Sequence, residues 1–594
     1  MSDPEAAPTQ APVVLEARAL IKRFRTGGRE VRALNDVSFR VRYGVVTGLV
    51  GPDGAGKTTL MRLAAGLLAP AAGDITVLGM DANRESLRVQ ASLGYMPQRF
   101  GLYEDLSVRE NLDLYADLQG VPVRQRGERY RELMHMTGLA PFSDRLAGRL
   151  SGGMKQKLGL ACTLVRVPRL LLLDEPTVGV DPVSRRELWA IVYRLVRDAG
   201  MSVLLSTAYL DEAERCDEVV LLHEGRVLAA GSPATLTARM QGRAFAVTAP
   251  GMNKRDILAR LAARPGVIDG VIQAEHVRVV TDRAQQPPDI GTLLPTSPSA
   301  RVDLVSPRFE DSFVALLRET RIAPARQPAA APVDTITPAE QAGEVVIEVD
   351  EVKRRFGEFY AVNGISFDVR QGEVFGLLGP NGAGKSTTFR MLCGLLPASA
   401  GTLRVAGLDL RHAAAAARGH IGYMSQKFSL YGNLSVRQNL DFFARVYGLS
   451  GRRRGERMEW ALTQFELSSH VDSASADLPL GYRQRLAMAC ALMHEPDILF
   501  LDEPTSGVDP LARREFWDQI NALSRAQVTV LVTTHFMEEA EYCDRLAIIA
   551  SGRILALGAP AQIKAAQAGQ RPEPTMEDAF INLIETFERR GERP

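Results

Sequence analysis

Two glycine-rich segments carry the strongest chemical signal in this sequence. GPDGAGKTT begins at Gly51 and GPNGAGKST begins at Gly379, and each follows an apolar run that is typical of a buried strand. Glycines let successive backbone N–H groups surround phosphate oxygens, and the start of the following helix adds its positive dipole end. A lysine in each segment, Lys57 or Lys385, has the length to reach the β- and γ-phosphates. The sequence therefore predicts two sites for a nucleoside triphosphate.

The phosphate contacts are expected at matching places in the two segments. A hydroxyl follows each lysine, so Thr58 and Ser386 are also expected to bind Mg²⁺. The predicted nucleotide-binding residues are Gly51, Gly54, Gly56, Lys57, Thr58 and Thr59 in the first segment, and Gly379, Asn381, Gly382, Gly384, Lys385, Ser386 and Thr387 in the second.

A second pair of segments supplies carboxylates. LLLLD (170–174) and ILFLD (498–502) are apolar runs that end in aspartate, as in a buried parallel strand that brings an acid to the edge of a sheet. Asp174 and Asp502 are predicted Mg²⁺ ligands. The residues that follow them, Glu175 and Glu503, have the reach to polarise an attacking water, which predicts hydrolysis of the nucleotide. The alternative is a solvated acid pair before a proline turn.

These motifs belong to an internal duplication. The two glycine-rich segments are 328 residues apart, and the same separation relates Gln98 to Gln426 and LLDEPTVGVDP (172–182) to FLDEPTSGVDP (500–510). A constant separation along such a length indicates two copies of one domain with no net insertion between the landmarks. The elements that position the chemistry are therefore expected twice.

The predicted organisation has five parts. A small α/β subdomain after the first copy has no counterpart in the second, and its segments predict the order strand, helix, strand, strand. No motif in it indicates a function. We expect a disordered leader at 1–12, the first nucleotide-binding domain at 13–240, the appended subdomain at 241–320, a Pro/Ala-rich linker at 321–343 and the second nucleotide-binding domain at 344–594.

Composition excludes several classes of protein. The 594 residues are 46% hydrophobic and 24% charged, as in ordinary globular domains, and the net charge of +1 offers no overall attraction to nucleic acid. The five cysteines form no paired motif, which argues against a cysteine metal site and fits a reducing, cytosolic compartment. The most apolar stretch, residues 63–73, is too short to span a bilayer, and the N-terminus lacks the pattern of a secretory signal.

With LSGGMKQ at 150–156, the motifs together resemble the nucleotide-binding domains of ATP-binding-cassette (ABC) proteins over nearly the whole chain. The resemblance implies an α/β P-loop NTPase fold in each copy, with a mixed sheet core and a helical subdomain, and ATP and Mg²⁺ as cofactors. It also implies that the two cassettes pair head to tail within one chain. The resemblance also implies roles for three sets of residues. Gln98 and Gln426 are the Q-loop glutamines beside the metal, and Asp181 and Asp509 are the D-loop aspartates. The signature residues Ser151, Gly152 and Gly153 contact the γ-phosphate that the partner cassette holds.

Each copy departs from the family pattern once. The second signature reads LPLGYRQ (478–484), so Pro479 replaces Ser151 and removes a hydroxyl. Leu480 replaces the following glycine and obstructs the close approach of a phosphate. The switch histidine of the family is His535 in the second copy and Ala208 in the first. The alternative role of His535 is that of a helix cap.

Under head-to-tail pairing, both departures fall on one composite site. That site contains Lys57, Asp174 and Glu175, and we expect it to bind ATP with little turnover. The other site combines the second copy with the intact signature and is expected to hydrolyse ATP. The predicted catalytic residues are Glu503, His535, Gln426 and Glu175.

The contacts to the adenine base are less well defined by the sequence. Phe24 and Phe356 lie before the phosphate segments at different spacings and are predicted to stack on adenine, unless they pack in the core or at its rim. The segments 98–111 and 426–439 keep Phe and Tyr at matching places. In similar transporter ATPases such segments receive coupling helices of membrane subunits; alternatively, these aromatics pack the helical subdomain.

The resemblance implies an ATPase that energises a transporter. The partners would be integral membrane permeases, two of the ABC-2 type, and the function drug export, with the chain in the cytoplasm on the inner face of the cell membrane. No nucleic-acid partner is expected. Two alternatives are a soluble tandem ABC ATPase that acts on ribosomes or nucleic acid, and a tandem importer ATPase. The sequence does not specify the transported substrate.

Overall fold

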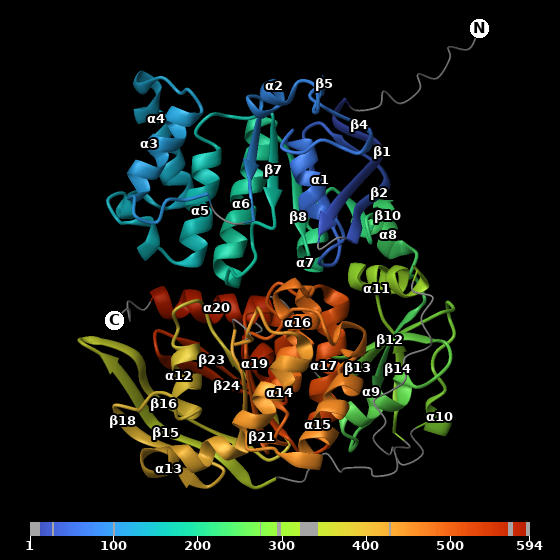
Figure 1. Ribbon diagram of the computed structural model, residues 1–594, viewed down its shortest axis with the longest axis vertical. Helices are drawn as coiled ribbons and strands as arrows, with labels where there is room; N and C mark the ends of the chain where they lie inside the picture. Colours follow the sequence, from blue (N-terminus) through green and yellow to red (C-terminus); the bar gives the residue numbers. More distant parts are fainter. Residues whose placement is uncertain are drawn as a thin grey trace. The chain divides into compact units, whose positions relative to one another are not determined.

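The computed structural model describes residues 12–26, 29–98, 101–273, 275–293, 299–320, 343–426, 429–567 and 574–589. These residues form two compact units (Figure 1). Unit 1 contains Met1–Val180, Ser184–Arg239 and Arg308–Leu317, and unit 2 contains Asp181–Val183, Met240–Pro307 and Arg318–Pro594. The expected leader and linker, apart from one residue of each, lie outside the described residues, and the expected domain boundaries stay predictions.

Unit 1 is built on two sheets. A six-stranded sheet is parallel except for its edge strand β10, and the short strands β3, β7 and β8 are buried at every residue, which explains their unbroken apolar sequences. A smaller antiparallel sheet completes the unit. In sheet order the strands are β10 (Arg226–Gly231), β9 (Glu218–His223), β3 (Val46–Val50), β8 (Ser202–Thr207), β7 (Leu170–Asp174) and β6 (Leu93–Met96), and then β2 (Arg29–Arg42), β1 (Val13–Thr26), β4 (Ala72–Val77) and β5 (Met80–Asp81).

The helices of unit 1 fall into two groups. Helices α3, α4 and α5 pack together to one side of the sheets, whereas α1 lies against them (Figure 1). Helix α3 begins with a capping box in which Ser107 and Glu110 satisfy each other's backbone N–H groups. The helices are α1 (Lys57–Ala64), α2 (Ser86–Gln90), α3 (Val108–Leu118), α4 (Val123–Thr137), α5 (Gly152–Thr163), α6 (Pro182–Ala199), α7 (Leu210–Ala213), α8 (Pro233–Ala238) and α11 (Phe309–Thr320).

Unit 2 repeats this architecture. Its six-stranded sheet has the corresponding order β20-β21-β22-β17-β23-β24, and β16-β15-β18-β19 form the smaller sheet. The strands are β15 (Val345–Phe356), β16 (Phe359–Arg370), β17 (Val374–Leu378), β18 (Ala400–Val405), β19 (Leu408–Asp409), β20 (Ile421–Met424), β21 (Ile498–Asp502), β22 (Thr529–Thr534), β23 (Arg545–Ala550) and β24 (Arg553–Gly558).

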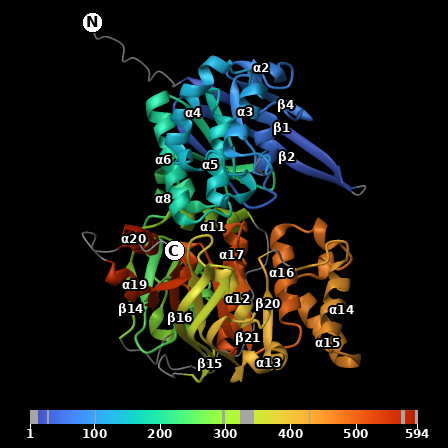
Figure 2. The same ribbon diagram turned by 90° about the vertical axis from the view of Figure 1, so that its left-hand side faces the viewer.

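A helical group again lies to one side of the unit 2 sheets. Helices α14, α15 and α16 pack together there, well separated from β15 and β16 in Figure 2. The helices are α12 (Lys385–Leu392), α13 (Leu410–Ala417), α14 (Val436–Val446), α15 (Gly451–Gln464), α16 (Leu480–Ala491), α17 (Pro510–Arg525), α18 (Met537–Ala540), α19 (Pro560–Ala566) and α20 (Met576–Arg589).

The appended subdomain has its own four-stranded antiparallel sheet, in the order β12-β13-β11-β14, with α9 packed against it. The predicted strand, helix, strand and strand are β11, α9, β13 and β14, but β12 and the short helix α10 were not predicted. The β12 sequence VIDGVIQ contains an acid and a glycine and lacks a clear alternation. Residues 240–307 pack with unit 2, although they follow the first copy in the chain. The elements are β11 (Ala244–Thr248), α9 (Lys254–Ala262), β12 (Val267–Gln273), β13 (His276–Thr281), α10 (Ile290–Leu293) and β14 (Arg301–Leu304).

Two global properties agree with the composition. Among the described residues, no helix is both long and apolar enough to cross a membrane. All five cysteines are buried and unpaired, and burial raises the pKa of each thiol. The cysteines therefore act as small apolar core residues.

Candidate active sites

Each phosphate loop joins a buried strand to a helix. The loop after β3 leads into α1, and the loop after β17 leads into α12. The Nζ atom of Lys57 donates hydrogen bonds to the carbonyl oxygens of Gly51 (2.8 Å) and Pro52 (3.1 Å). Lys385 makes the same pair of bonds to the corresponding residues, at 2.7 and 3.1 Å. The loop backbone thus folds around each buried ammonium group and holds it at the start of the helix.

Glycine is required where the loop turns into the helix. Gly56 and Gly384 have φ angles of 102° and 104°, which lie in the left-handed region. A Cβ atom would lie 2.6 Å from the Ala33 carbonyl oxygen at the first position and 2.4 Å from the Ala361 carbonyl oxygen at the second. A side chain at either position would therefore displace the loop.

A hydroxyl and a carboxylate meet beside each loop. Thr58 Oγ1 lies 3.2 Å from Asp174 Oδ1, and Ser386 Oγ lies 3.4 Å from Asp502 Oδ1. Burial raises the pKa of both aspartates, the charge of the neighbouring glutamate adds to this, and the phosphate-loop lysine only partly offsets it. A divalent cation would add positive charge there, and Mg²⁺ needs only one or two protein oxygens besides water and phosphate. The donor set fits Mg²⁺, although the described parts of the chain contain no group of three acidic, His or Cys side chains that could by themselves hold a metal ion.

The predicted catalytic glutamates, Glu175 and Glu503, have nearly the same strained backbone φ angle. Glu175 and Glu503 have φ angles of 49° and 46°, which side-chain-bearing residues rarely adopt. Each lies at the carboxyl edge of the sheet, directly after β7 or β21. Gln98 Nε2 donates to Glu175 Oε2 at 2.6 Å, and Gln426 Nε2 donates to Glu503 Oε2 at 2.8 Å. The structure therefore brings the predicted Q-loop and catalytic side chains together in each unit.

The second site has a basic side chain that the first lacks. His535 Nδ1 lies 3.3 Å from Glu503 Oε2, and the ring is 3% exposed. Burial alone would raise the pKa of Glu503, but the hydrogen bond and charge of His535 and the charge of Lys385 hold it below its ordinary value. Nε2 of His535 has no hydrogen-bond partner among the described residues. The corresponding Ala208 is buried and has no polar side-chain atom.

The glutamate contacts the phosphate-loop lysine more closely in the first site. Lys57 Nζ lies 3.1 Å from Glu175 Oε1, whereas the corresponding distance from Lys385 to Glu503 is 3.9 Å. In unit 2, Lys385 is nearest to Oε1 of Glu503, and His535 is nearest to the other carboxylate oxygen, Oε2. Glu503 is thus held between two basic groups and Glu175 by one.

The two signature segments begin helices in different ways. Ser151 is the N-cap of α5, and its hydroxyl accepts a hydrogen bond from the Met154 backbone N–H at 3.3 Å. Pro479 is the N-cap of α16 and provides no side-chain hydrogen bond. By contrast, the D-loop residue Asp509 does cap its helix, α17, by accepting hydrogen bonds from the N–H groups of Leu511 and Ala512. Helix α16 therefore lacks the side-chain cap that α5 has, and the effect of Pro479 on a bound phosphate stays a prediction.

The two aromatic residues that are predicted to stack on adenine lie on the surface. Phe24 is 37% exposed with Lys22 Nζ 5.3 Å from its ring centroid, and Phe356 is 47% exposed with Arg354 at 4.6 Å. A fully core-facing role is therefore wrong for both; stacking on adenine stays a prediction.

Two further polar residues lie at the sites and were missed by the sequence reasoning. Ser206 Oγ donates to Asp174 Oδ1 at 2.7 Å and accepts from the Glu175 backbone N–H at 2.9 Å. Thr533 repeats both contacts in unit 2. The signal that could have identified them is the repeat itself, since both copies end β8 or β22 with hydroxyl residues.

The comparison with known proteins identifies the family. The sequence profile described as "ABC transporter" matches residues 34–178 and 362–506. The "Probable multidrug ABC transporter ATP-binding protein YbhF" of Escherichia coli (strain K12) is 52% identical over 579 residues, which cover 97% of this chain and 98% of that protein. This chain belongs to the ABC transporter family.

Shorter relatives of this ABC protein match one of its two halves. The "Nod factor export ATP-binding protein I" of Paraburkholderia xenovorans (strain LB400) is 42% identical over 257 residues, covering 42% of this chain and 84% of that protein. A solved structure described as the "ATP binding subunit of ABC transporter" is 29% identical and covers 40% of this chain and 99% of its own, with a TM-score of 0.37.

The family membership confirms three predictions. The ABC protein has two P-loop NTPase cassettes of α/β fold, it binds ATP, and it is an ATPase. We call the copy in unit 1 the first cassette and the copy in unit 2 the second cassette.

Proposed function

We propose that this ABC ATPase powers the export of drugs or other xenobiotics through integral membrane permeases. The observation that carries the proposal is the 52% identity, over 97% of the chain, to a probable multidrug ABC transporter ATP-binding protein. Both phosphate loops, both acidic strands and both Q-loop contacts are in place, which supports a subunit that binds two ATP molecules.

In this proposal the residues of the second cassette carry the reaction. Lys385 and the loop N–H groups bind the β- and γ-phosphates of ATP. Ser386 and Asp502 would hold Mg²⁺, as Thr58 and Asp174 would in the first cassette; bound Mg²⁺ neutralises phosphate charge. Glu503 accepts a hydrogen bond from the attacking water and orients it. His535 places Nε2 near the γ-phosphate, where a donor stabilises the developing charge.

We further propose that the two sites differ in turnover. In a head-to-tail pairing, Ser151, Gly152 and Gly153 complete the site of the second cassette. Pro479 and Leu480 would face the first cassette, whose Ala208 also lacks a donor. Losing one positioned donor typically costs about 10²–10³ in rate, so two losses leave the first site slow. The first site then mainly binds ATP and holds the cassettes together.

The membrane partners are proposed to dock at matching tyrosines on the two cassettes. Tyr103 is 57% exposed and Tyr431 is 46% exposed, although the Tyr431 ring also packs at 4.6 Å from Phe442. Both follow the Q-loop glutamines, which contact the catalytic glutamates. A permease bound there is placed to sense the state of each site. In this proposal the chain lies on the inner face of the cell membrane, bound to two ABC-2-type permeases.

Replacing both tyrosines by aspartate is expected to release the permeases. The tagged protein, expressed from its own locus and purified from detergent-solubilised membranes, should carry two hydrophobic membrane proteins with it. The double variant Tyr103→Asp, Tyr431→Asp should reduce the recovered amount of both about tenfold or more. Leu87→Asp is the control, because Leu87 is an apolar residue of α2 that is 79% exposed and lies outside the segment 98–111. Recovery of ribosomes in place of membrane proteins would contradict the proposal.

Drug export is tested separately in cells. A strain without this gene should accumulate more of at least one compound in a panel of fluorescent dyes and antibiotics, and the intact gene should reverse the change. Glu503→Gln should fail to reverse it, because that variant binds ATP without turnover. If permeases are recovered but no compound changes its accumulation, the transporter role stands and the drug substrate is wrong.

A further inference from the structure

We propose that residues 240–307, the part of the appended subdomain that belongs to unit 2, position the ATP site of the second cassette, and that Arg255 is the positioning residue. The subdomain follows the first cassette in the chain, and its sequence has no motif. Its contacts within unit 2 nevertheless reach α17 and the segment before β23, and that segment is hydrogen-bonded to the strand of the second phosphate loop. The inference uses only ATP binding by that cassette, not the transported substrate.

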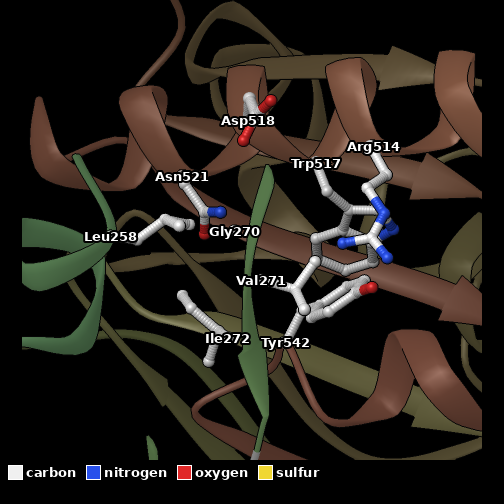
Figure 3. Close-up of a pocket in the computed structure, with 9 residues that line it drawn as sticks. All are labelled: Leu258, Gly270, Val271, Ile272, Arg514, Trp517, Asp518, Asn521 and Tyr542. Carbon is white, nitrogen blue, oxygen red and sulfur yellow. The ribbon is translucent and has the colours of Figure 1, made fainter. Parts of the chain in front are cut away.

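The subdomain packs closely on helix α17. Leu258 of α9 and Ile272 of β12 lie on one side of the contact, and Trp517 and Tyr542 of the second cassette lie on the other (Figure 3). The cavity left between them has a volume of about 10 Å³, which is about the minimum for one water molecule. The cavity therefore leaves room for about one water molecule between the two sets of side chains.

Buried ion pairs fix the orientation of this contact. Asp269 of β12 binds Arg514 of α17 and Arg318, both at 2.8 Å, and its side chain is 3% exposed. Asp256 of α9 binds Arg525 of α17 at 2.9 Å. Removing one partner of such a pair leaves an uncompensated buried charge, so these pairs disfavour alternative ways of docking.

Arg255 makes the contact that leads to the nucleotide. Its guanidinium donates to Asn521 Oδ1 (3.0 Å), to Asp544 Oδ1 (2.8 Å) and to the Tyr542 carbonyl oxygen (3.4 Å), and its side chain is 4% exposed. One side chain of the subdomain thus joins α17 to the segment that precedes β23. A planar guanidinium is suited to hold several acceptors in fixed directions.

Asp544 links Arg255 to β17, the strand that precedes the second phosphate loop. Its other oxygen, Oδ2, accepts from the Val374 backbone N–H at 2.9 Å. Val374 begins β17, and β17 leads directly to Gly379 of the loop that holds Lys385. Arg255 is therefore connected to the second phosphate loop through Asp544 and strand β17.

In the first cassette, no subdomain among the described residues packs on the surface that corresponds to the one Arg255 contacts. Asp217 accepts from the Val46 backbone N–H at 2.8 Å, as Asp544 does from Val374, but Asp217 is exposed. The α6 residues that match Arg514, Asp518 and Arg525 are also exposed; they are Arg186, Ala190 and Arg197.

One aromatic contact differs in the same way. In the first cassette, Trp189 packs against Tyr193 of its own helix at 5.4 Å. In the second cassette, Trp517 packs against Tyr542 at 5.0 Å, and Asn521 occupies the place of Tyr193. The smaller amide is the acceptor for Arg255. The surface of the second cassette thus has the residues that receive the subdomain.

The test is ATP affinity at each cassette, measured by photolabelling the full-length protein with 8-azido-ATP and quantifying labelled peptides from each half. Arg255→Ala should raise the ATP analogue concentration that half-saturates labelling of the second cassette about tenfold. The half-saturating concentration for the first cassette should not change. Arg255→Lys, which keeps the charge beside Asp544, should retain most of the affinity. Adding Asp544→Asn to Arg255→Ala should cause little further loss, since the two act through one contact.

Arg278→Ala is the matched control for folding of the subdomain. Arg278 is a buried arginine of β13 that donates to the Ser306 carbonyl oxygen within the same subdomain. This variant should lower the thermal stability without a selective loss of affinity at the second cassette. An equal loss in Arg278→Ala and Arg255→Ala, a loss at both cassettes, or no loss in Arg255→Ala would overturn the proposal. None of these outcomes depends on the transported substrate or on the permeases.

Discussion

Glu503→Gln is expected to lower the steady-state ATPase rate by about 10²–10⁴-fold, whereas Glu175→Gln should leave most of the activity. Glutamine keeps the shape of the side chain but removes the carboxylate that orients the water. Glu503 is held between Lys385 and His535, and its pKa lies below the ordinary value, so it is ionised at neutral pH. Release of inorganic phosphate by the purified protein at saturating ATP measures the effect.

Glu175→Gln is a matched control, because Glu175 has the same backbone conformation and the same glutamine contact. Both variants should still bind ATP, which equilibrium binding of a radiolabelled nucleotide can verify. If Glu175→Gln abolished turnover and Glu503→Gln spared it, the assignment of the two sites would be reversed. Equal losses would indicate that both sites turn over in one coupled cycle.

Transferring the second signature into the first cassette should also nearly stop turnover. We expect Ser151→Pro with Gly152→Leu to lower the ATPase rate by about 10²-fold or more, because the site of the second cassette loses a hydroxyl and the room for a phosphate. The reciprocal change, Pro479→Ser with Leu480→Gly, should leave the rate within a few-fold, since Ala208 still lacks the donor of a complete site. The same phosphate-release assay compares the two.

The chain itself indicates that the exchanged residues fit the backbone. Ser151 and Pro479 have φ angles of −65° and −53° and ψ angles of 162° and 151°, and each is the N-cap of a helix of equal length. The lost hydroxyl cap should cost about 1 kcal/mol of stability, which a thermal melt can measure. Unchanged turnover in the folded Ser151→Pro, Gly152→Leu variant would rule out the proposed head-to-tail assignment.

The local chemistry of each site was predictable because it depends on short segments. Lys57 and Lys385 lie within a few residues of the carbonyl groups that hold them, so the loop motif was sufficient to place them. Asp174 and Glu175 follow an unbroken apolar strand, and the parallel sheet brings that strand end beside the loop. Ser206 and Thr533 were missed because a hydroxyl at a strand end is common, and only the comparison of the two copies, which both end this strand with hydroxyl residues, singles them out.

The amino-acid sequence by itself determined the duplication, the ABC family, the two phosphate loops and the loss of signature and histidine residues. These features reside in short segments or in a constant separation between repeats. Only the tertiary structure decided that residues 240–307 pack with the second cassette and that Arg255 reaches Asp544. The physical reason is that such docking depends on apolar packing and buried ion pairs between residues more than 200 positions apart, and no local pattern encodes which surface they meet.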